Sequence, residues 1–334
     1  MANNRLSGWL INHWYNSKSP LRLLQPLSWL FVGVVTIRRW AYLHGFRRTT
    51  RLAVPVIVVG NISVGGTGKT PLVIWLVAYL RNAGWKPGII SRGYRGNAGD
   101  WPQLITRDSD PRVIGDEPLL IVRRSGTPVA VGPDRIKAAR ILLDQSECDL
   151  IVSDDGLQHY PLERDIEIAV VDGQRRYGNG SCLPAGPLRD PIDRLKSVDL
   201  IVCNGDPENG EIAMGLCGEF AVNLCHPEKK IALTEFIPKT CHAIAGIGNP
   251  QRFFDHLRGF GLQCDEHAFP DHYTYRCEDL VFPDETPILM TEKDAVKCEA
   301  FGLDNCWYVP VDARPDINLG VSIEELLRKK IDEQ

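Results

Sequence analysis

The segment from Gly65 to Thr70 has the residue types of a loop that binds phosphate groups. Its three glycines let the backbone curl so that amide groups point at phosphate oxygens, and a helix beginning near Lys69 adds the positive end of its dipole. The Lys69 ammonium would reach the terminal phosphates, and the Thr70 hydroxyl would bind Mg²⁺. An apolar run that begins at Val54 precedes the loop and an apolar helical segment follows it, as this motif requires. Because Ser63 replaces the first glycine of the general pattern, an ordinary turn between a strand and a helix stays an alternative.

Two adjacent carboxylates after a second apolar run could complete a magnesium site. The run Leu150–Ser153 leads into Asp154 and Asp155, an arrangement in which one acid completes the Mg²⁺ shell. Paired acids at the end of a strand can instead cap the next helix. The sequence does not say which of the two aspartates is the metal ligand.

Two further loops carry arginines that suit a position facing phosphate. The loop Ser91–Gly96 follows an apolar run and holds Arg92 and Tyr94 on a flexible backbone. The other loop is bounded by prolines and places Arg189 beside Asp190, so that the guanidinium could stabilise charge on a γ-phosphate. A solvated basic turn and a surface ion pair, respectively, are the alternatives.

Asp116 and His272 are candidates for activating the nucleophile of a phosphoryl transfer. Asp116 lies in the sequence Gly-Asp-Glu-Pro and His272 in Pro-Asp-His-Tyr. An isolated carboxylate has too low a pKa to accept a proton easily, whereas a neighbouring histidine can orient it or share the proton. The two residues are 156 positions apart, and the sequence alone does not show that they meet.

Continuous apolar runs predict a sheet covered on both faces. The segment from Pro71 to Asn82 is apolar nearly all round, as expected for a helix packed on a sheet. Further runs, most of them separated by helix-compatible segments such as Asp134–Gln145, lie at Pro87–Ser91, Pro128–Gly132, Leu150–Ser153, Ile166–Asp172 and Val198–Cys203. This pattern indicates a P-loop NTPase-like α/β fold with a doubly wound, mainly parallel sheet, which binds ligands beyond the carboxyl ends of its strands.

A second, smaller α/β domain is expected after a turn-forming break at residues 204–210. Its elements are predicted at Cys241–Gly248, Gln251–Gly259, Pro287–Met290 with a helix from Glu292, and Trp307–Val311. We therefore divide the chain into an N-terminal segment of residues 1–50, a core domain of residues 51–203 and a C-terminal domain of residues 204–334. A cleft between the two domains is a natural place for a nucleotide and an acceptor to meet.

Charge is distributed unevenly along the 334 residues. The net charge is −4, yet residues 1–99 contain 13 Lys or Arg and no Asp or Glu. Such a basic end suits polyanions, whether nucleotide phosphates, nucleic acid or an anionic membrane surface. The ten cysteines form no C-x-x-C pair, which favours a reducing compartment such as the cytoplasm.

Residues 1–50 have the composition of a helix that associates with a membrane surface. Half of the tryptophans lie there, namely Trp9, Trp14, Trp29 and Trp40. The apolar run Leu27–Ile37 is 11 residues long, and crossing a bilayer takes about 20. An amphipathic helix at the interface, with indoles at headgroup depth and arginines on anionic lipid, fits this pattern. A terminal helix packed on the core of its own domain is the alternative.

Six motifs, in this order, resemble those of the tetraacyldisaccharide 4′-kinases of lipid A biosynthesis. They are Ser63-Val-Gly-Gly-Thr-Gly-Lys-Thr70, Ser91-Arg-Gly-Tyr94, Gly115-Asp-Glu-Pro118, Asp154-Asp-Gly-Leu-Gln-His159, Leu183-Pro-Ala-Gly-Pro-Leu-Arg189 and Phe269-Pro-Asp-His-Tyr273. The resemblance covers residues 55–297. Ser63 is usual for this family at the position of the first glycine, so the departure from the general motif favours the resemblance.

The resemblance implies a kinase that uses ATP and Mg²⁺ at the cytoplasmic face of the inner membrane of a Gram-negative bacterium. Its reaction would transfer the γ-phosphate of ATP to the 4′-hydroxyl of a tetraacylated glucosamine disaccharide 1-phosphate, giving lipid IVA. Because this acceptor carries four acyl chains and stays in the bilayer, the basic N-terminal segment would concentrate the enzyme at the membrane. No nucleic-acid partner is implied.

The resemblance also assigns catalytic roles. Asp116 and His272 would form the dyad that activates the sugar hydroxyl, with Lys69 and Arg189 on the phosphates. The nucleotide contacts would be Ser63, Val64, Gly65, Gly66, Thr67, Gly68, Lys69, Thr70, Arg92 and Tyr94.

The metal ligands implied by the resemblance are Thr70 and the pair Asp154 and Asp155. Asp190 falls at a family position that faces nucleotide and metal. The family often has Glu there, which makes a metal contact by the shorter Asp190 side chain less certain.

A membrane-associated switch ATPase of the septum-site or partition type is the main rival interpretation. Such proteins carry Gly-Gly-x-Gly-Lys-Thr, but their signature lysine precedes the two glycines, where this chain has Val64. A GTPase fits less well because Thr291–Asp294 lacks the residue between Lys and Asp that guanine recognition uses. A nucleic-acid binder would explain the basic end, but no recognition fold is visible.

Overall fold

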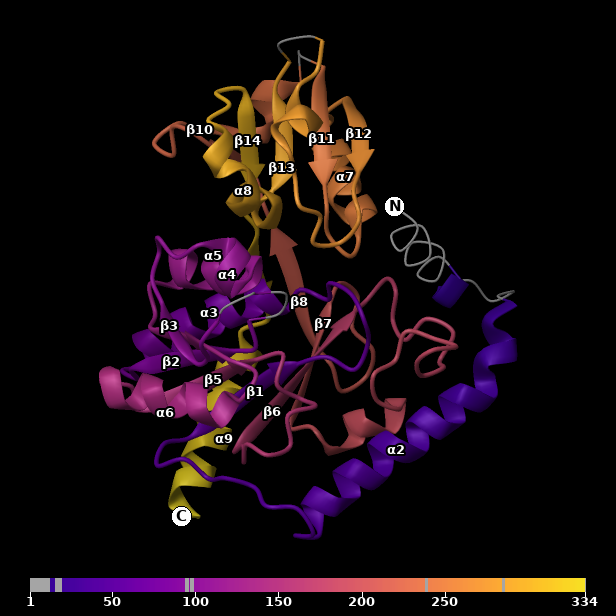
Figure 1. The fold of residues 1–334 in the computed structure, drawn as a ribbon, viewed down its shortest axis with the longest axis vertical. Coiled ribbons are helices and arrows are strands. Elements are labelled where there is room, and N and C mark those ends of the chain that lie inside the picture. The colour runs from indigo at the N-terminus through magenta and orange to yellow at the C-terminus, as the bar shows by residue number, and fades with distance from the viewer. Residues whose placement is uncertain are drawn as a thin grey trace.

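Two β-sheets organise the protein (Figure 1). The computed structural model describes residues 13–15, 20–93, 96, 99–237, 240–283 and 286–333. The larger sheet and its helices form the lower part of the molecule in Figure 1, and the smaller sheet forms the upper part.

Among the described residues, the larger sheet has nine strands in the order β15-β8-β7-β6-β1-β5-β2-β4-β3. The strands are parallel except that β3 pairs antiparallel with β4, and β15 with β8. Every residue of β1, β2, β4 and β5 is buried, as continuous apolar runs predict for strands covered on both faces. The strands are β1 Val56–Gly60, β2 Pro87–Ser91, β3 Gln103–Ile105, β4 Val129–Val131, β5 Leu150–Asp154, β6 Ile166–Asp172, β7 Leu200–Asn204, β8 Ile212–Cys217 and β15 Asp312–Pro315.

Helices cover both faces of this sheet. On one face, α3 (Lys69–Asn82), α5 (Asp116–Ser125) and α9 (Asn318–Asp332) bury their apolar side chains in one core. On the other face, α6 (Arg135–Gln145) and part of α2 (Gln25–Leu43) pack on a second core. This arrangement confirms the predicted doubly wound, mainly parallel α/β fold. The short helices of this part are η1 Pro20–Leu24, α4 Pro111–Ile114 and η2 Ile192–Ser197.

The smaller sheet has the strand order β10-β9-β14-β13-β11-β12 in the part of the chain that the structure describes. Four neighbouring strands, β14, β13, β11 and β12, are parallel and form the part of the sheet that lies between α7 on one face and α8 on the other. The elements are β9 Phe220–Asn223, β10 Lys230–Ala232, η3 Leu233–Phe236, β11 Cys241–Ala245, α7 Pro250–Gly259, β12 Cys264–Ala268, η4 Cys277–Leu280, β13 Ile288–Thr291, α8 Glu292–Cys298, η5 Glu299–Phe301 and β14 Cys306–Val309.

Sheet membership differs from the predicted division of the chain at residue 204. After that residue β8 continues the larger sheet beside β7, and near the C-terminus β15 and α9 return to it. The smaller sheet is therefore built from residues 220–309 and is inserted between β8 and β15. The alternation of strands and helices does not reveal this return, because β15 is a short edge strand that contains charged residues and a proline.

Helix α2 runs along one side of the larger part (Figure 1) and is only partly packed on it. Ser28 is buried and donates from Oγ to the Cys182 carbonyl oxygen at 2.8 Å. The opposite side exposes a stripe of large apolar side chains, which begins at Leu23 of η1 and continues along α2 with helical spacing through Leu27, Leu30, Val34 and Ile37. Within the described residues, none of the helices has both the length and the apolar composition needed to span a membrane. Residues 1–12 and 16–19 of the predicted N-terminal segment lie outside the described residues.

Candidate active site

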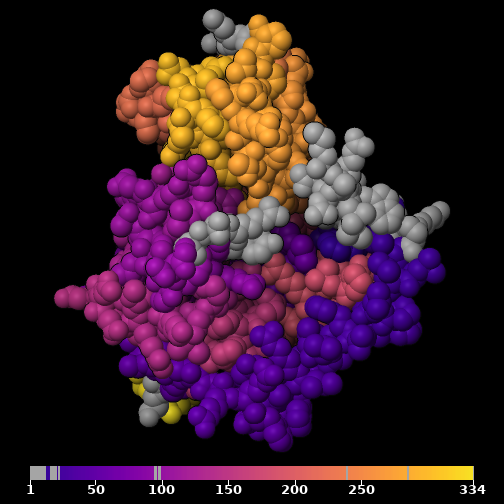
Figure 2. All heavy atoms as spheres, in the orientation of Figure 1, coloured from indigo at the N-terminus to yellow at the C-terminus, as the bar shows by residue number. Residues whose placement is uncertain are grey.

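A cleft of about 1170 Å³ separates the two sheets. It is lined by loops that follow β1, β5, β6 and β7 of the larger sheet and by loops that follow β11 and β13 of the smaller one. Figure 2 shows the smaller part of the molecule seated across the larger part. The cleft thus lies beyond the carboxyl ends of parallel strands, where α/β sheets bind ligands.

The predicted phosphate loop keeps its shape through its glycines and Asn204. Gly65 and Gly68 have φ of +109° and +99°, in the left-handed region that favours glycine. Asn204, at the end of β7, donates from Nδ2 to the Thr67 carbonyl oxygen at 3.1 Å, and a Cβ on Gly68 would lie 2.8 Å from that nitrogen. Lys69 begins α3 directly after the loop. The loop from Val64 to Thr70 lines the cleft.

The residues before the glycines fasten this loop to the loop that carries Arg189. The Val64 backbone nitrogen donates to the Pro187 carbonyl oxygen at 2.8 Å, and Ser63 pairs with Leu188. Ser63 is buried, whereas Val64 lines the cleft. This pairing brings Arg189 close to the phosphate loop.

Asp155 is engaged by two cations. Its carboxylate lies 3.5 Å from Lys69 Nζ and 2.9 Å from Arg189 Nη1. Burial opposes ionisation, but Lys69 and Arg189 hold the pKa of the Asp155 carboxyl well below its usual range. Asp155 is therefore a carboxylate that holds Lys69 and Arg189 beside the predicted phosphate loop.

Asp154 is in a different electrostatic situation. It is almost fully buried and accepts a hydrogen bond from Ser91 Oγ at 3.1 Å, and no ion pair to its carboxylate is found among the described residues. Burial, together with the negative charges of Glu117 and Asp155, raises the pKa of Asp154 to about 6. A bound cation would reverse this effect, so Asp154 suits metal binding better than Asp155 does.

The structure brings Asp116 and His272 together across the cleft. His272 Nδ1 lies 3.0 Å from Asp116 Oδ2. His272 has a φ of +58°, and its backbone nitrogen donates to the Gly246 carbonyl oxygen at 3.1 Å. Burial acts against both charges, but the contact lowers the pKa of Asp116 to about 2 and raises that of His272. A proton added to this pair is therefore held by the imidazole and not by the carboxylate.

Asp190 does not join the other predicted metal ligands. Its carboxylate is buried and accepts a hydrogen bond from Gln158 Nε2 at 2.7 Å. Within the described part of the chain, Asp190 is not one of the residues that line the cleft, although Arg189 is. The neighbouring side chains of Arg189 and Asp190 point in different directions, so Arg189 lies beside the phosphate loop and Asp190 does not.

The loop after β2 is described in part. Arg92 is exposed and lines the cleft. Tyr94, the other predicted nucleotide contact in this loop, lies outside the described residues.

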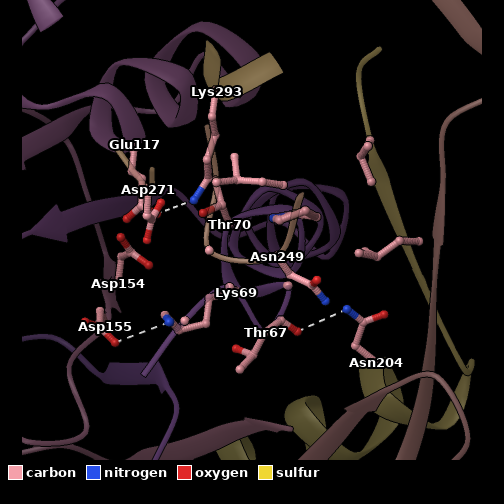
Figure 3. A pocket seen from close by; sticks show the side chains of 18 of the residues that line it. Thr67, Lys69, Thr70, Glu117, Asp154, Asp155, Asn204, Asn249, Asp271 and Lys293 are labelled. Carbon is pink, nitrogen blue, oxygen red and sulfur yellow. Dashed lines mark hydrogen bonds and ion pairs between the residues drawn. The ribbon is translucent and has the colours of Figure 1, made fainter. Parts of the chain in front are cut away.

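Three residues of the cleft were not singled out from the sequence. Glu117 and Lys293 form an ion pair between the two sheets, and Figure 3 shows Lys293 beside Thr70 and opposite Asp154. Arg135 donates from Nη2 to the carbonyl oxygens of Asp154 and Asp155, at 2.9 and 2.8 Å, and so fixes the end of β5. Glu117 and Lys293 lie in motifs that the sequence displayed, but their pairing depends on the approach of the two sheets.

A metal ion in this cleft would need ligands besides carboxylates and imidazoles. No group of three or more His, Cys, Asp or Glu side chains that could hold a metal is found among the described residues. Asp154 and the buried Thr70 fit Mg²⁺, because that ion takes one or two protein ligands together with phosphate oxygens and water.

Comparison with known proteins gives consistent results. Residues 20–331 match the LpxK family, described as tetraacyldisaccharide-1-P 4′-kinase. A tetraacyldisaccharide 4′-kinase of Nitrosococcus oceani is 51% identical over 97% of this chain and 95% of the relative. A second, from Methylobacillus flagellatus, is 50% identical over 98% of each chain. A solved structure of LpxK from Aquifex aeolicus in complex with ATP has a TM-score of 0.77 and 26% identity, covering 92% of this chain and 99% of that one.

Proposed function

Because the chain belongs to the tetraacyldisaccharide-1-P 4′-kinase family, we propose that the cleft between its two sheets is where ATP and the lipid disaccharide react. The protein is an ATP-dependent kinase that phosphorylates the 4′-hydroxyl of a tetraacyldisaccharide 1-phosphate in lipid A synthesis, and lipid IVA is the product. The observation that carries the placement of the reaction is the contact of Asp116 with His272 in the cleft that the phosphate loop lines. A switch ATPase of the septum-site type is not favoured.

The phosphate loop would hold the polyphosphate of ATP. Its backbone amides and the first turn of α3 face the cleft, and Lys69 and Arg189 supply positive charge from one wall. The Asp155 carboxylate keeps both cations at this position. Phosphoryl transfer depends mostly on positioning and charge of this kind.

Mg²⁺ would be held by Thr70 and Asp154, the two residues whose chemistry fits it. When bound, the ion neutralises charge on the phosphates. Asp190 is left out of this assignment because its carboxylate is engaged by Gln158.

The Asp116–His272 pair would activate the acceptor. As the sugar 4′-oxygen attacks the γ-phosphorus, a P–O bond forms, the bond between that phosphorus and the β–γ bridging oxygen breaks, and ADP leaves. The hydroxyl proton passes to Asp116, and His272 shares it through the contact at 3.0 Å. For this sharing His272 must be neutral before the transfer. Lys69 and Arg189 face the negative charge that develops on the transferred group.

Helix α2 would place the enzyme on the membrane that contains its substrate, at the cytoplasmic face where ATP is available. The stripe from Leu23 to Ile37 is apolar and exposed, with Leu30 67% and Ile37 68% accessible. Arg38, at the end of this stripe, lines the cleft. The proposed membrane-facing stripe thus ends beside a residue of the cleft, which suits an acceptor drawn from a membrane.

The transfer is tested with purified full-length protein, labelled ATP, Mg²⁺ and the disaccharide monophosphate dispersed in detergent. We expect a lipid with two phosphates and no appreciable ATP consumption without the acceptor. Equal ATP hydrolysis with and without the lipid would contradict the proposal.

The membrane contact is tested separately with vesicles that contain anionic lipid. The variant Leu30→Ser/Val34→Ser should sediment with vesicles less than the unchanged protein does, since each lost apolar side chain removes roughly 1.5–3 kcal/mol of burial. Its turnover on detergent-dispersed substrate should stay unchanged. Undiminished sedimentation would place the membrane contact elsewhere.

A further inference from the structure

The smaller part of the molecule reaches the phosphate loop directly. A Cβ on Gly248, in the loop after β11, would lie 3.1 Å from the backbone nitrogen of Gly66 and 3.3 Å from the Cα of Gly65. Arg175, in the loop after β6, donates from Nη1 to the Gly248 carbonyl oxygen at 3.0 Å. Residues at the carboxyl ends of the smaller sheet are therefore close enough to contact a nucleotide in this loop.

Lys293 is one of the cations that this part brings into the cleft; Arg252 of α7 is another, and it pairs with Asp172 of the larger part. It is the second residue of α8, whose first turn is fixed by the Thr291 cap and by the buried Asp294. The side chain of Lys293 crosses to the larger part and pairs with Glu117, the residue after Asp116 in α5. Figure 3 shows its ammonium between Glu117 and Thr70, with Lys69 and Asp155 farther along the cleft.

The charges around Lys293 keep it ionised. Burial acts against the ammonium, but the Glu117 and Asp116 carboxylates raise the pKa of Lys293 above its ordinary value. Lys293 in turn lowers the pKa of Glu117. Burial raises that pKa, and the charge of Lys69 lowers it further. The ion pair thus lies within the field of the phosphate-loop lysine.

Lys69, Arg189 and Lys293, three of the cations that line the cleft, occupy two separate places. Lys69 and Arg189 share one carboxylate, Asp155, and both belong to the larger part. Lys293 has a different carboxylate and belongs to the smaller part. A terminal phosphate beyond Lys69 and Thr70 would have Lys69 and Arg189 on one side and Lys293 on the other.

We propose that Lys293 is a further catalytic residue, which contacts the γ-phosphoryl group of ATP from the smaller part of the molecule. The Glu117 carboxylate holds the ammonium at that position until the nucleotide binds. Lys293 donates hydrogen bonds to γ-phosphate oxygens and gains or loses no proton, while the bonds that form and break are those of the transfer to the 4′-hydroxyl. This inference rests on the proposed function for its catalytic part only, because the phosphate contact itself requires no acceptor.

A structural ion pair that merely joins the two parts is the competing explanation. Arg123 and Glu299 provide a matched control, because they pair at 2.6 Å between α5 and η5, which directly follows α8. Neither residue lines the cleft among the described residues. If joining the two parts is the whole role of Lys293, Arg123→Met should resemble Lys293→Met.

The test measures binding of β,γ-methylene-ATP and of ADP, each with Mg²⁺, by titration calorimetry. For Lys293→Met we expect affinity for the ATP analogue to fall roughly 10- to 100-fold, with a change of less than about threefold for ADP. Lys293→Arg should recover part of the loss, and Arg123→Met should change neither affinity. The ratio of the two affinities within one variant does not depend on how much of the sample is folded.

Equal losses for the two nucleotides, or no loss for either, would overturn the proposal. The proposal would also be overturned if Arg123→Met lowered the ratio of ATP-analogue affinity to ADP affinity as much as Lys293→Met did. Turnover with the lipid acceptor is measured in parallel, and kcat of Lys293→Met should fall at least as far as analogue affinity. Absence of lipid phosphorylation in the unchanged protein and in every variant would count against the proposed function. The γ-phosphate contact would still be decided by the calorimetry, because that measurement uses no lipid.

Discussion

The two walls of the cleft are built in different ways. Lys69, Asp155 and Arg189 all belong to the larger part, and their contacts form within one sheet and its loops. In contrast, Asp116 meets His272, and Glu117 meets Lys293, only where the two sheets approach each other. The comparison teaches that the proposed nucleotide end, which consists of the phosphate loop, Lys69, Asp155 and Arg189, forms within the larger part and receives only the proposed γ-phosphate contact of Lys293 from the smaller one. The proposed acceptor end, Asp116 with His272, depends on both parts.

The largest effect is expected at the acceptor end, from Asp116→Asn. Removing a general base typically costs 10²–10⁴-fold in rate, so kcat should fall by about that factor. Affinity for ATP, measured by calorimetry, should stay within about twofold, because Asp116 lies outside the phosphate loop. Asp110→Asn, a change at the exposed cap of α4, is the control. If ATP affinity fell as far as kcat did, Asp116 would also contribute to nucleotide binding, and the proposed division into a nucleotide end and an acceptor end would be wrong.

A second contrast lies within the nucleotide end, between Asp154→Asn and Asp155→Asn. Asp154→Asn should raise the Mg²⁺ concentration needed for half-maximal activity by roughly tenfold or more, because a metal-bound carboxylate is lost. Asp155→Asn releases Lys69 and Arg189 and should instead weaken ATP binding at saturating Mg²⁺. Titrations of activity against Mg²⁺ and against ATP distinguish the two outcomes. Identical Mg²⁺ titrations for both variants would argue against Asp154 as the ligand.

The pH dependence should separate the chemistry of the acceptor end from its stability. Asp116 raises the pKa of His272 above the ordinary value of about 6.5, and the dyad can accept a proton only when His272 is neutral. The rate should therefore fall about tenfold per pH unit below this raised pKa. The stabilising contact between the parts behaves in the opposite way: it is fully present below the ordinary histidine pKa and is lost as pH rises through the raised one.

Rate profiles and thermal melts across pH 5–9 test both statements. His272→Gln should remove the acidic limb of the rate profile while lowering the maximum. An acidic limb that persists in this variant would have to come from another group.

The smallest effect is expected for a contact inside the larger part. Tyr79 of α3 donates to Glu324 of α9 at 2.6 Å, far from either pair that joins the sheets. Tyr79→Phe should lower the free energy of unfolding by roughly 0.5–1.5 kcal/mol, as a single hydrogen bond does. Neither kcat nor ATP affinity should change. A clear loss of activity would mean that the nucleotide end depends on packing between these two helices.

Much of the larger part was predictable because its signals are local. The apolar runs Pro87–Ser91 and Ile166–Asp172 coincide with β2 and β6, since a strand covered on both faces consists mostly of apolar residues. The phosphate loop is equally local, because its glycines and Lys69 act within one turn of chain. The composition of the N-terminal segment also predicted an amphipathic helix, and α2 exposes an apolar stripe, whose contact with a membrane stays a proposal.

The remainder depends on contacts that a sequence does not contain. The direction of Asp190 away from the cleft follows from Gln158, 32 positions earlier. Lys293 lies in a segment that the sequence displayed as a poor guanine motif, and its pairing with Glu117 appears only in the folded chain. The difference between Asp154 and Asp155 likewise comes from which cations the fold places beside each carboxylate.

The pairing of β8 with β15 has a consequence for the ancestry and engineering of the chain. Cys217 and Asp312 are partners in this antiparallel ladder, so the inserted unit leaves and re-enters the larger part at neighbouring points. A short turn could join them after excision of residues 218–311, with no other connection lengthened. The larger part is thus a topologically closed module, into which the smaller unit could have been inserted at a hairpin.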